Sequence, residues 1–137
     1  MNINFYFEDI EEFQLDLPKI TSWINSTITE EGQEPGELSF ILCSDDYLLE
    51  INKQYLNHDY YTDIITFDYV EDGIVSGDIF ISVDRVKENA DEYQVSFANE
   101  LNRIIIHGVL HLLGYKDKEA DEKQLMTSKE DYYLSVY

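Results

Sequence analysis

Polar side chains recur every three or four residues within an otherwise apolar stretch, and they are the residues best suited to chemistry. Glu100, Arg103, His107 and His111 occupy these positions in the segment 97–113. Such spacings place side chains on one face of a helix, so the two imidazoles can converge on one ion. Because burying an unpaired charge is costly, this polar stripe has to face a cleft or be paired internally.

A glycine and a carboxylate follow the second histidine at the spacing of a known zinc motif. Gly114 is placed to end the helix and reverse the chain, and Asp117 comes three residues later. The frame is that of the long zinc motif H-E-x-x-H-x-x-G-x-x-H, with Asp117 in place of the third histidine. Zinc accepts a carboxylate oxygen as well as an imidazole in a three-ligand site. His107, His111 and Asp117 are therefore predicted to hold one zinc ion per chain.

The glutamate of the long zinc motif is missing, because Gly108 stands in its place. In a metalloprotease that glutamate takes a proton from the zinc-bound water. Its absence argues against peptide hydrolysis. A purely structural interpretation also stays open, in which both histidines are satisfied within the core and Asp117 caps a following helix.

Three blocks of the chain resemble the YbeY family, the bacterial endoribonucleases of rRNA maturation and ribosome quality control. The blocks are His107-Gly-Val-Leu-His-Leu-Leu-Gly-Tyr with Met126 downstream, Asn52-Lys-Gln-Tyr-Leu-Asn-His-Asp-Tyr-Tyr-Thr-Asp-Ile-Ile-Thr-Phe, and Gly77-Asp-Ile-Phe-Ile-Ser. They follow the family's order and spacing. The resemblance implies a cytoplasmic, zinc-dependent endoribonuclease, specific for single strands, that matures the 3′ end of 16S rRNA from its precursor.

Two positions depart from the family's pattern. Asp117 stands where the family usually has a third histidine, which makes the site less positive. Leu56 stands where the family usually has an arginine implicated in catalysis, so a phosphate clamp is missing. His58 and Arg103 are the remaining candidates for substrate contact, although Arg103 can equally form an ion pair with Glu100. No general base can be named from the sequence.

The charge balance is strongly acidic, with 29 Asp and Glu against nine Lys and Arg and a formal net charge of −20. Long-range repulsion argues against DNA and membranes as partners and makes the chain a poor autonomous RNA binder. Recruitment to the ribosomal subunit through a ribosomal protein with a basic face reconciles this charge with an RNA substrate. Two alternatives remain: a zinc hydrolase of a small-molecule substrate, and a non-catalytic ribosome assembly factor that retains the metal site.

The elements that position these residues are expected to form one metal-binding domain over residues 1–137. Apolar periodicity, caps and turn residues predict strands over 2–7, 37–43, 63–69 and 77–82. Helices are predicted from Asp16 to Gly32, from Ser44 to Leu56, and over 83–93, 97–113 and 119–133. This βαβαββααα order predicts an α+β fold, with one mixed four-stranded sheet, about five helices and a metzincin-like metal motif. The single cysteine, Cys43, fits a reducing cytoplasm.

Overall fold

The structure is a computed structural model that describes residues 3–137. Its elements are β1 (Ile3–Glu8), α1 (Leu17–Glu30), β2 (Glu34–Cys43), α2 (Asp45–Leu56), β3 (Ile64–Asp68), β4 (Ile74–Ser82), α3 (Val83–Tyr93), α4 (Phe97–Leu112) and α5 (Ala120–Ser135). The predicted order of strands and helices and the α+β class are confirmed. Asn2, at the start of the first predicted strand, lies outside the described residues.

The four strands form one mixed sheet in the order β1-β2-β4-β3. β1 and β4 both run parallel to β2, whereas β3 runs antiparallel to β4 as the other arm of a hairpin. β2 begins at Glu34, three residues before its predicted start. The register of β2 against β4 shifts between Pro35 and Leu38, and such an irregularity is where a strand tolerates proline and glycine.

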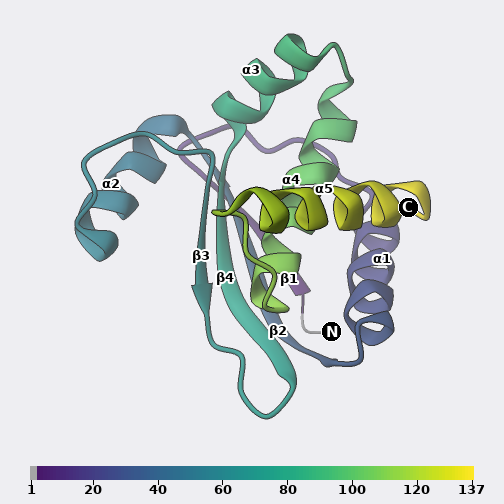
Figure 1. Cartoon of the computed structure of the whole chain (residues 1–137). Helices are drawn as coiled ribbons and strands as arrows, with labels where there is room; N and C mark the ends of the chain where they lie inside the picture. The colour runs from purple at the N-terminus through teal and green to yellow at the C-terminus, as the bar shows by residue number, and fades with distance from the viewer. Residues whose placement is uncertain (1–2) are drawn as a thin grey trace.

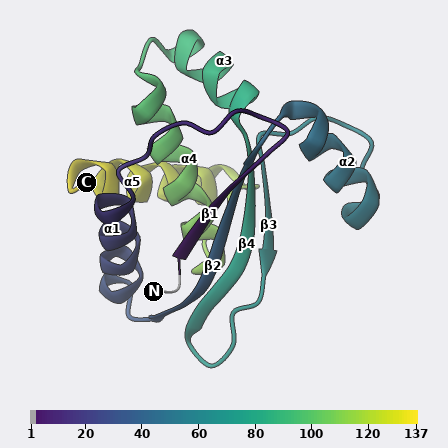
Figure 2. The same ribbon diagram turned by 180° about the vertical axis from the view of Figure 1, so that it is seen from behind.

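The two faces of the sheet are covered unequally (Figures 1 and 2). Ile79 and Ile81 of β4 join the main core, which also contains buried residues of α1, α3, α4 and α5. Phe80 points to the opposite face and packs in a smaller cluster with Leu48 of α2, as side-chain alternation along a strand requires. Cys43 lies fully buried in this smaller cluster, where burial raises the pKa of its thiol to about 12. It is a packing residue at the end of an apolar strand.

Side-chain caps begin the helices where the sequence predicts them. Asp16 accepts a hydrogen bond from the Lys19 amide at 3.3 Å, and Ser44 accepts one from the Tyr47 amide at 3.1 Å. Ser96 caps α4 in the same way. Each cap satisfies a backbone donor that would otherwise lack a partner in the first turn.

α5 crosses α4 and reaches α1 (Figure 1). The Trp23 indole of α1 donates a hydrogen bond to the Tyr133 carbonyl at 2.8 Å, and its ring meets the edge of Tyr137 at 4.8 Å between centroids. Both rings of the Trp23–Tyr133 pair are buried. The carboxyl end of the last helix is thus seated on α1, while the helix crosses α4. Within residues 3–137, no helix is long and apolar enough to cross a bilayer.

Candidate metal centre

Three potential ligand atoms converge beside the last turn of α4. The Nε2 atoms of His107 and His111 lie 3.3 and 3.4 Å from the same oxygen, Oδ2 of Asp117. The three ligand atoms all lie within 4.8 Å of one another. Donors bound tetrahedrally to zinc at about 2.0–2.1 Å are about 3.4 Å apart, so the two distances from Asp117 to the imidazoles match those of zinc ligands.

Each imidazole is oriented by a hydrogen bond at its other nitrogen. Nδ1 of His111 lies 3.0 Å from the carbonyl oxygen of Tyr115, and Nδ1 of His107 lies 2.6 Å from a carboxylate oxygen of Glu130. A carbonyl or carboxylate oxygen accepts, so Nδ1 of both rings carries the proton. The lone pairs are then on the Nε2 atoms that face Asp117. This is the tautomer that metal-binding histidines adopt when an oxygen holds the other nitrogen.

Glu130 is the residue at this site that the sequence analysis missed. It lies on α5 and its side chain is 9% exposed. Its second oxygen accepts a hydrogen bond from the guanidinium of Arg103 at 2.9 Å. That guanidinium also donates a hydrogen bond to Asp131 at 2.8 Å. Glu130 stands between Lys129 and Asp131 in a helix rich in charge, so residue type alone does not single it out. Arg103, Glu130 and His107 form a continuous hydrogen-bonded chain.

This chain changes the titration of His107. Burial alone would lower the pKa of the imidazole, but the hydrogen bond to Glu130 and the charges of Glu130 and Asp117 raise the pKa overall. In the metal-free protein, His107 therefore holds a second proton at a higher pH than an ordinary histidine does.

Arg103 faces the carboxylates of α5. Glu130 and Asp131 are its ion-pair partners, in place of the alternative pairing with Glu100. Glu100 is 6% exposed, and burial raises the pKa of its carboxyl although the charge of Arg103 opposes that rise. Both residues line a cavity of about 200 Å³ that His107 also lines. Arg103 is therefore close to the candidate centre, and its contact with substrate stays a prediction.

His58 lies in the loop after α2 and pairs with Tyr60. Its Nδ1 lies 2.9 Å from the Tyr60 hydroxyl, and the two rings stack at 5.1 Å. The three-residue ligand group found within residues 3–137 does not include His58. Leu56, at the position of the family's usual arginine, is the last residue of α2 and is 39% exposed.

Two glycines explain the local shape of α4. A Cβ on Gly108 would lie 3.1 Å from side-chain carbons of Ile64 and Ile79, so this position faces the sheet and a glutamate here would enter the core. Gly114 has a φ of +106° and reverses the chain after His111, as predicted.

Asp117 lies before α5, whose start is capped by Glu119 and Glu122 together. The interpretation of Asp117 as a helix cap is therefore wrong.

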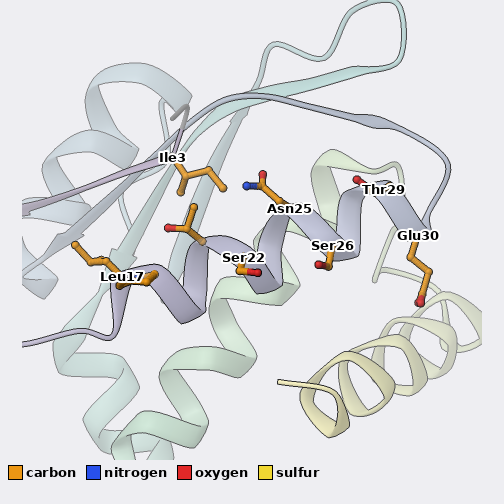
Figure 3. Close-up of a pocket in the computed structure, with 9 residues that line it drawn as sticks. Ile3, Leu17, Ser22, Asn25, Ser26, Thr29 and Glu30 are labelled. Atoms are coloured by element: carbon orange, nitrogen blue, oxygen red, sulfur yellow. The ribbon is translucent and has the colours of Figure 1, made fainter.

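A larger hollow lies elsewhere, along the exposed side of α1. It measures about 980 Å³ and is lined by Ile3 and by small polar side chains of α1, including Ser22, Asn25 and Ser26 (Figure 3). Glu30 is the ionisable residue in its lining. Among residues 3–137, its lining has hydroxyls and an amide but no group of metal ligands and no nucleophile paired with a base. The centre on α4 is therefore the candidate active site.

Comparisons with known proteins agree with these motifs. The family model described as Endoribonuclease YbeY matches residues 6–137. The Endoribonuclease YbeY of Flavobacterium psychrophilum is 49% identical over 135 residues (98% of this chain and 96% of the relative). That of Flavobacterium johnsoniae is 48% identical over 136 residues (98% and 96%). The solution structure of a protein from Thermotoga maritima matches with a TM-score of 0.69 and 29% identity, over 96% of this chain and 87% of that one.

Proposed function

The chain belongs to the YbeY family of endoribonucleases, and from this membership we propose that it is a zinc-dependent endoribonuclease specific for single-stranded RNA. Its substrate is the 16S rRNA precursor, whose 3′ end it matures, and it takes part in ribosome quality control. One observation supports this most directly: His107, His111 and Asp117 present three donor atoms within 4.8 Å of one another, and the Asp117 oxygen lies from each imidazole at the spacing of tetrahedral zinc ligands. The whole chain, 1–137, acts as one metal-binding domain.

The roles of the side chains follow from their contacts. His107, His111 and Asp117 hold the ion, while Glu130 and the Tyr115 carbonyl keep the Nδ1 protons in place. When bound, zinc supplies positive charge at the scissile phosphate and makes water more acidic. Asp117 contributes one negative charge that a third histidine would not, so the centre is less positive than a three-histidine site.

The activity is tested with an end-labelled RNA offered as a single strand and as a duplex. Zinc-loaded protein is expected to cleave the single strand, to spare the duplex, and to lose cleavage in His111→Ala. Hydrolysis of small phosphate esters without RNA cleavage would instead indicate the small-molecule hydrolase. Zinc binding without any hydrolysis would indicate the non-catalytic assembly factor.

The acidic surface supports recruitment through a protein partner in the cytoplasm. Several of the nine basic residues lie near the metal motif, but Arg103 pairs with Glu130 and Asp131, and Lys129 pairs with Glu31. The field around the centre therefore stays unfavourable to a polyanion. We propose that a ribosomal protein with a basic face brings this chain to the ribosomal subunit, with neither DNA nor a membrane as partner. Its association with subunits should weaken as salt rises, and a salt-insensitive complex would contradict this.

Substitutions at Asp117 test the third ligand. Asp117→Ala is expected to weaken zinc binding by about tenfold or more, because a ligand is lost outright. Asp117→Asn should weaken it similarly, since a neutral amide is a poor zinc ligand, whereas Asp117→His should restore it. Competition with a chromophoric chelator measures all three affinities. Since Glu119 and Glu122 cap α5, none of these changes should cost the stability of a lost cap. Wild-type affinity in Asp117→Asn would mean that another group is the third ligand.

Zinc affinity should fall with acidification, and the fall should begin at a higher pH than for an ordinary imidazole. The ion competes with protons for His107, and the pKa of that residue is raised by its hydrogen bond to Glu130 and by nearby charge, against the effect of burial. Zinc binding is thus complete above the raised pKa and declines as the pH falls through it. Glu130→Gln should move the onset of the decline to lower pH. An identical pH profile in wild type and Glu130→Gln would contradict this role of Glu130.

A further inference from the structure

A partly buried carboxylate ties the ligand-bearing segment to the rest of the fold. Glu31, at the carboxyl end of α1, has a side chain that is only 11% exposed. It accepts hydrogen bonds from the Tyr115 hydroxyl at 2.5 Å, from the Tyr133 hydroxyl and from the Lys129 ammonium at 3.1 Å. Burial alone would raise the pKa of Glu31, but these three donors lower it overall, so the carboxylate stays charged. One side chain therefore joins α1, the turn after α4, and α5.

Tyr115 is the member of this network that belongs to the metal-binding segment. Its amide donates to the Leu110 carbonyl at 3.0 Å, and its own carbonyl lies 3.0 Å from Nδ1 of His111. Its ring lies 5.5 Å from the Lys129 ammonium. The residue is therefore held through its backbone by α4 and through its side chain by Glu31 and Lys129.

Asp117 depends on this anchor because no regular element holds it. The segment between Leu113 and the start of α5 is neither helix nor strand, and the Asp117 side chain is 38% exposed. The course of the chain after Tyr115 determines how close its carboxylate comes to the two histidines. At the other end of the segment, the capping box of Glu119 and Glu122 fixes the first turn of α5.

We propose that Glu31 is a positioning residue for the metal centre, acting through its hydrogen bond to the Tyr115 hydroxyl. That bond holds the segment after α4 in the course that brings Asp117 to the Nε2 atoms and keeps the Tyr115 carbonyl against His111. The inference rests on the metal centre of the proposed function. It assigns a role to the residue that ends α1, far from the ligands in sequence.

The test compares two tyrosines that bind the same carboxylate. Tyr115→Phe and Tyr133→Phe each delete one hydroxyl bonded to Glu31, but only Tyr115 belongs to the ligand segment. Tyr133 is also held by burial of its ring and by the Trp23 hydrogen bond to its carbonyl, so α5 should stay seated without its hydroxyl. The readouts are zinc affinity, by chelator competition, and urea unfolding of the metal-free protein.

Tyr115→Phe is expected to weaken zinc binding by about tenfold, the lower end of what outer partners of metal ligands contribute. Tyr133→Phe should leave zinc affinity within about twofold of wild type. The two tyrosine variants should destabilise the metal-free protein to a similar extent. Glu31→Gln keeps a side-chain oxygen that can accept from the Tyr115 hydroxyl, so it should retain more zinc affinity than Glu31→Ala. Unchanged affinity in Tyr115→Phe, or an equal loss in both tyrosine variants, would overturn the proposal while leaving the metal centre intact. A wild-type protein that binds no zinc, or His111→Ala with wild-type affinity, would overturn the metal centre itself and this inference with it.

Discussion

His111→Ala is expected to remove zinc from the protein and to abolish RNA cleavage, while the fold persists. The outer partners of metal ligands are worth about 10–100-fold in affinity, so the loss of a ligand itself is expected to cost at least as much. The change should leave the main core intact, because the His111 side chain is 26% exposed and lies beside the last turn of α4. Metal per chain, measured by elemental analysis of protein purified without a histidine tag, should fall from about one to near zero.

His58→Ala is the matched control, because it deletes an imidazole that pairs with Tyr60 and lies outside the ligand group. It should keep its zinc. His107→Ala should also lose the metal, but it leaves the buried Glu130 without one of its partners, so its stability should fall further than that of His111→Ala. Stoichiometric zinc in the double variant of His107 and His111 would show that the ion binds elsewhere.

Gly77→Ala is expected to destabilise the protein by about 3 kcal/mol, since overpacking against backbone forces the strands apart. A Cβ at this position would lie 2.5 Å from the Phe67 carbonyl oxygen and 3.1 Å from both terminal methyl groups of Leu112. The carbonyl belongs to the strand next to β4, so no side-chain rotation relieves the contact. Urea unfolding of the metal-free protein, followed by circular dichroism, measures the loss.

Gly108→Ala provides the comparison. The three atoms nearest its Cβ would be side-chain carbons of Ile64 and Ile79 at 3.1 to 3.2 Å, and these can shift slightly. Alanine also favours the helix by about 1 kcal/mol over glycine, which offsets part of the crowding. The expected change is within about 1 kcal/mol of wild type. A loss in Gly77→Ala no larger than that in Gly108→Ala would contradict the backbone clash.

Local signals were enough to predict much of the fold and the three donors of the candidate site. Ser44 and Asp16 cap their helices by hydrogen bonds to amides three residues away, so a short stretch of sequence is enough to predict each contact. His107, His111 and Asp117 lie within one helix end and the turn that follows, and their geometry is set by helical spacing and by the positive φ of Gly114.

What the sequence did not reveal depends on contacts between distant segments. Glu130 meets Arg103 and His107 only because α5 crosses α4, and the spacing of charges along α5 does not specify that crossing. The partnership of Glu31 with Tyr115 joins residues 84 positions apart. β2 extends back to Glu34 because the β4 hairpin supplies a partner for it, which outweighs the low strand propensity of Pro35 and Gly36.

The seating of the last helix on Trp23 gives the molecule a built-in optical reporter. Trp23 is the chain's one tryptophan, and its indole hydrogen-bonds the Tyr133 carbonyl and meets the Tyr137 ring, which lie at the carboxyl end of α5 and just beyond it. Glu130, which orients His107, precedes Tyr133 by one helical turn. Emission from Trp23 therefore follows the docking of the helix that supports the metal centre, and it does so without a label. Chelation that leaves this emission unchanged has removed the ion alone, whereas chelation that shifts it has also released the helix.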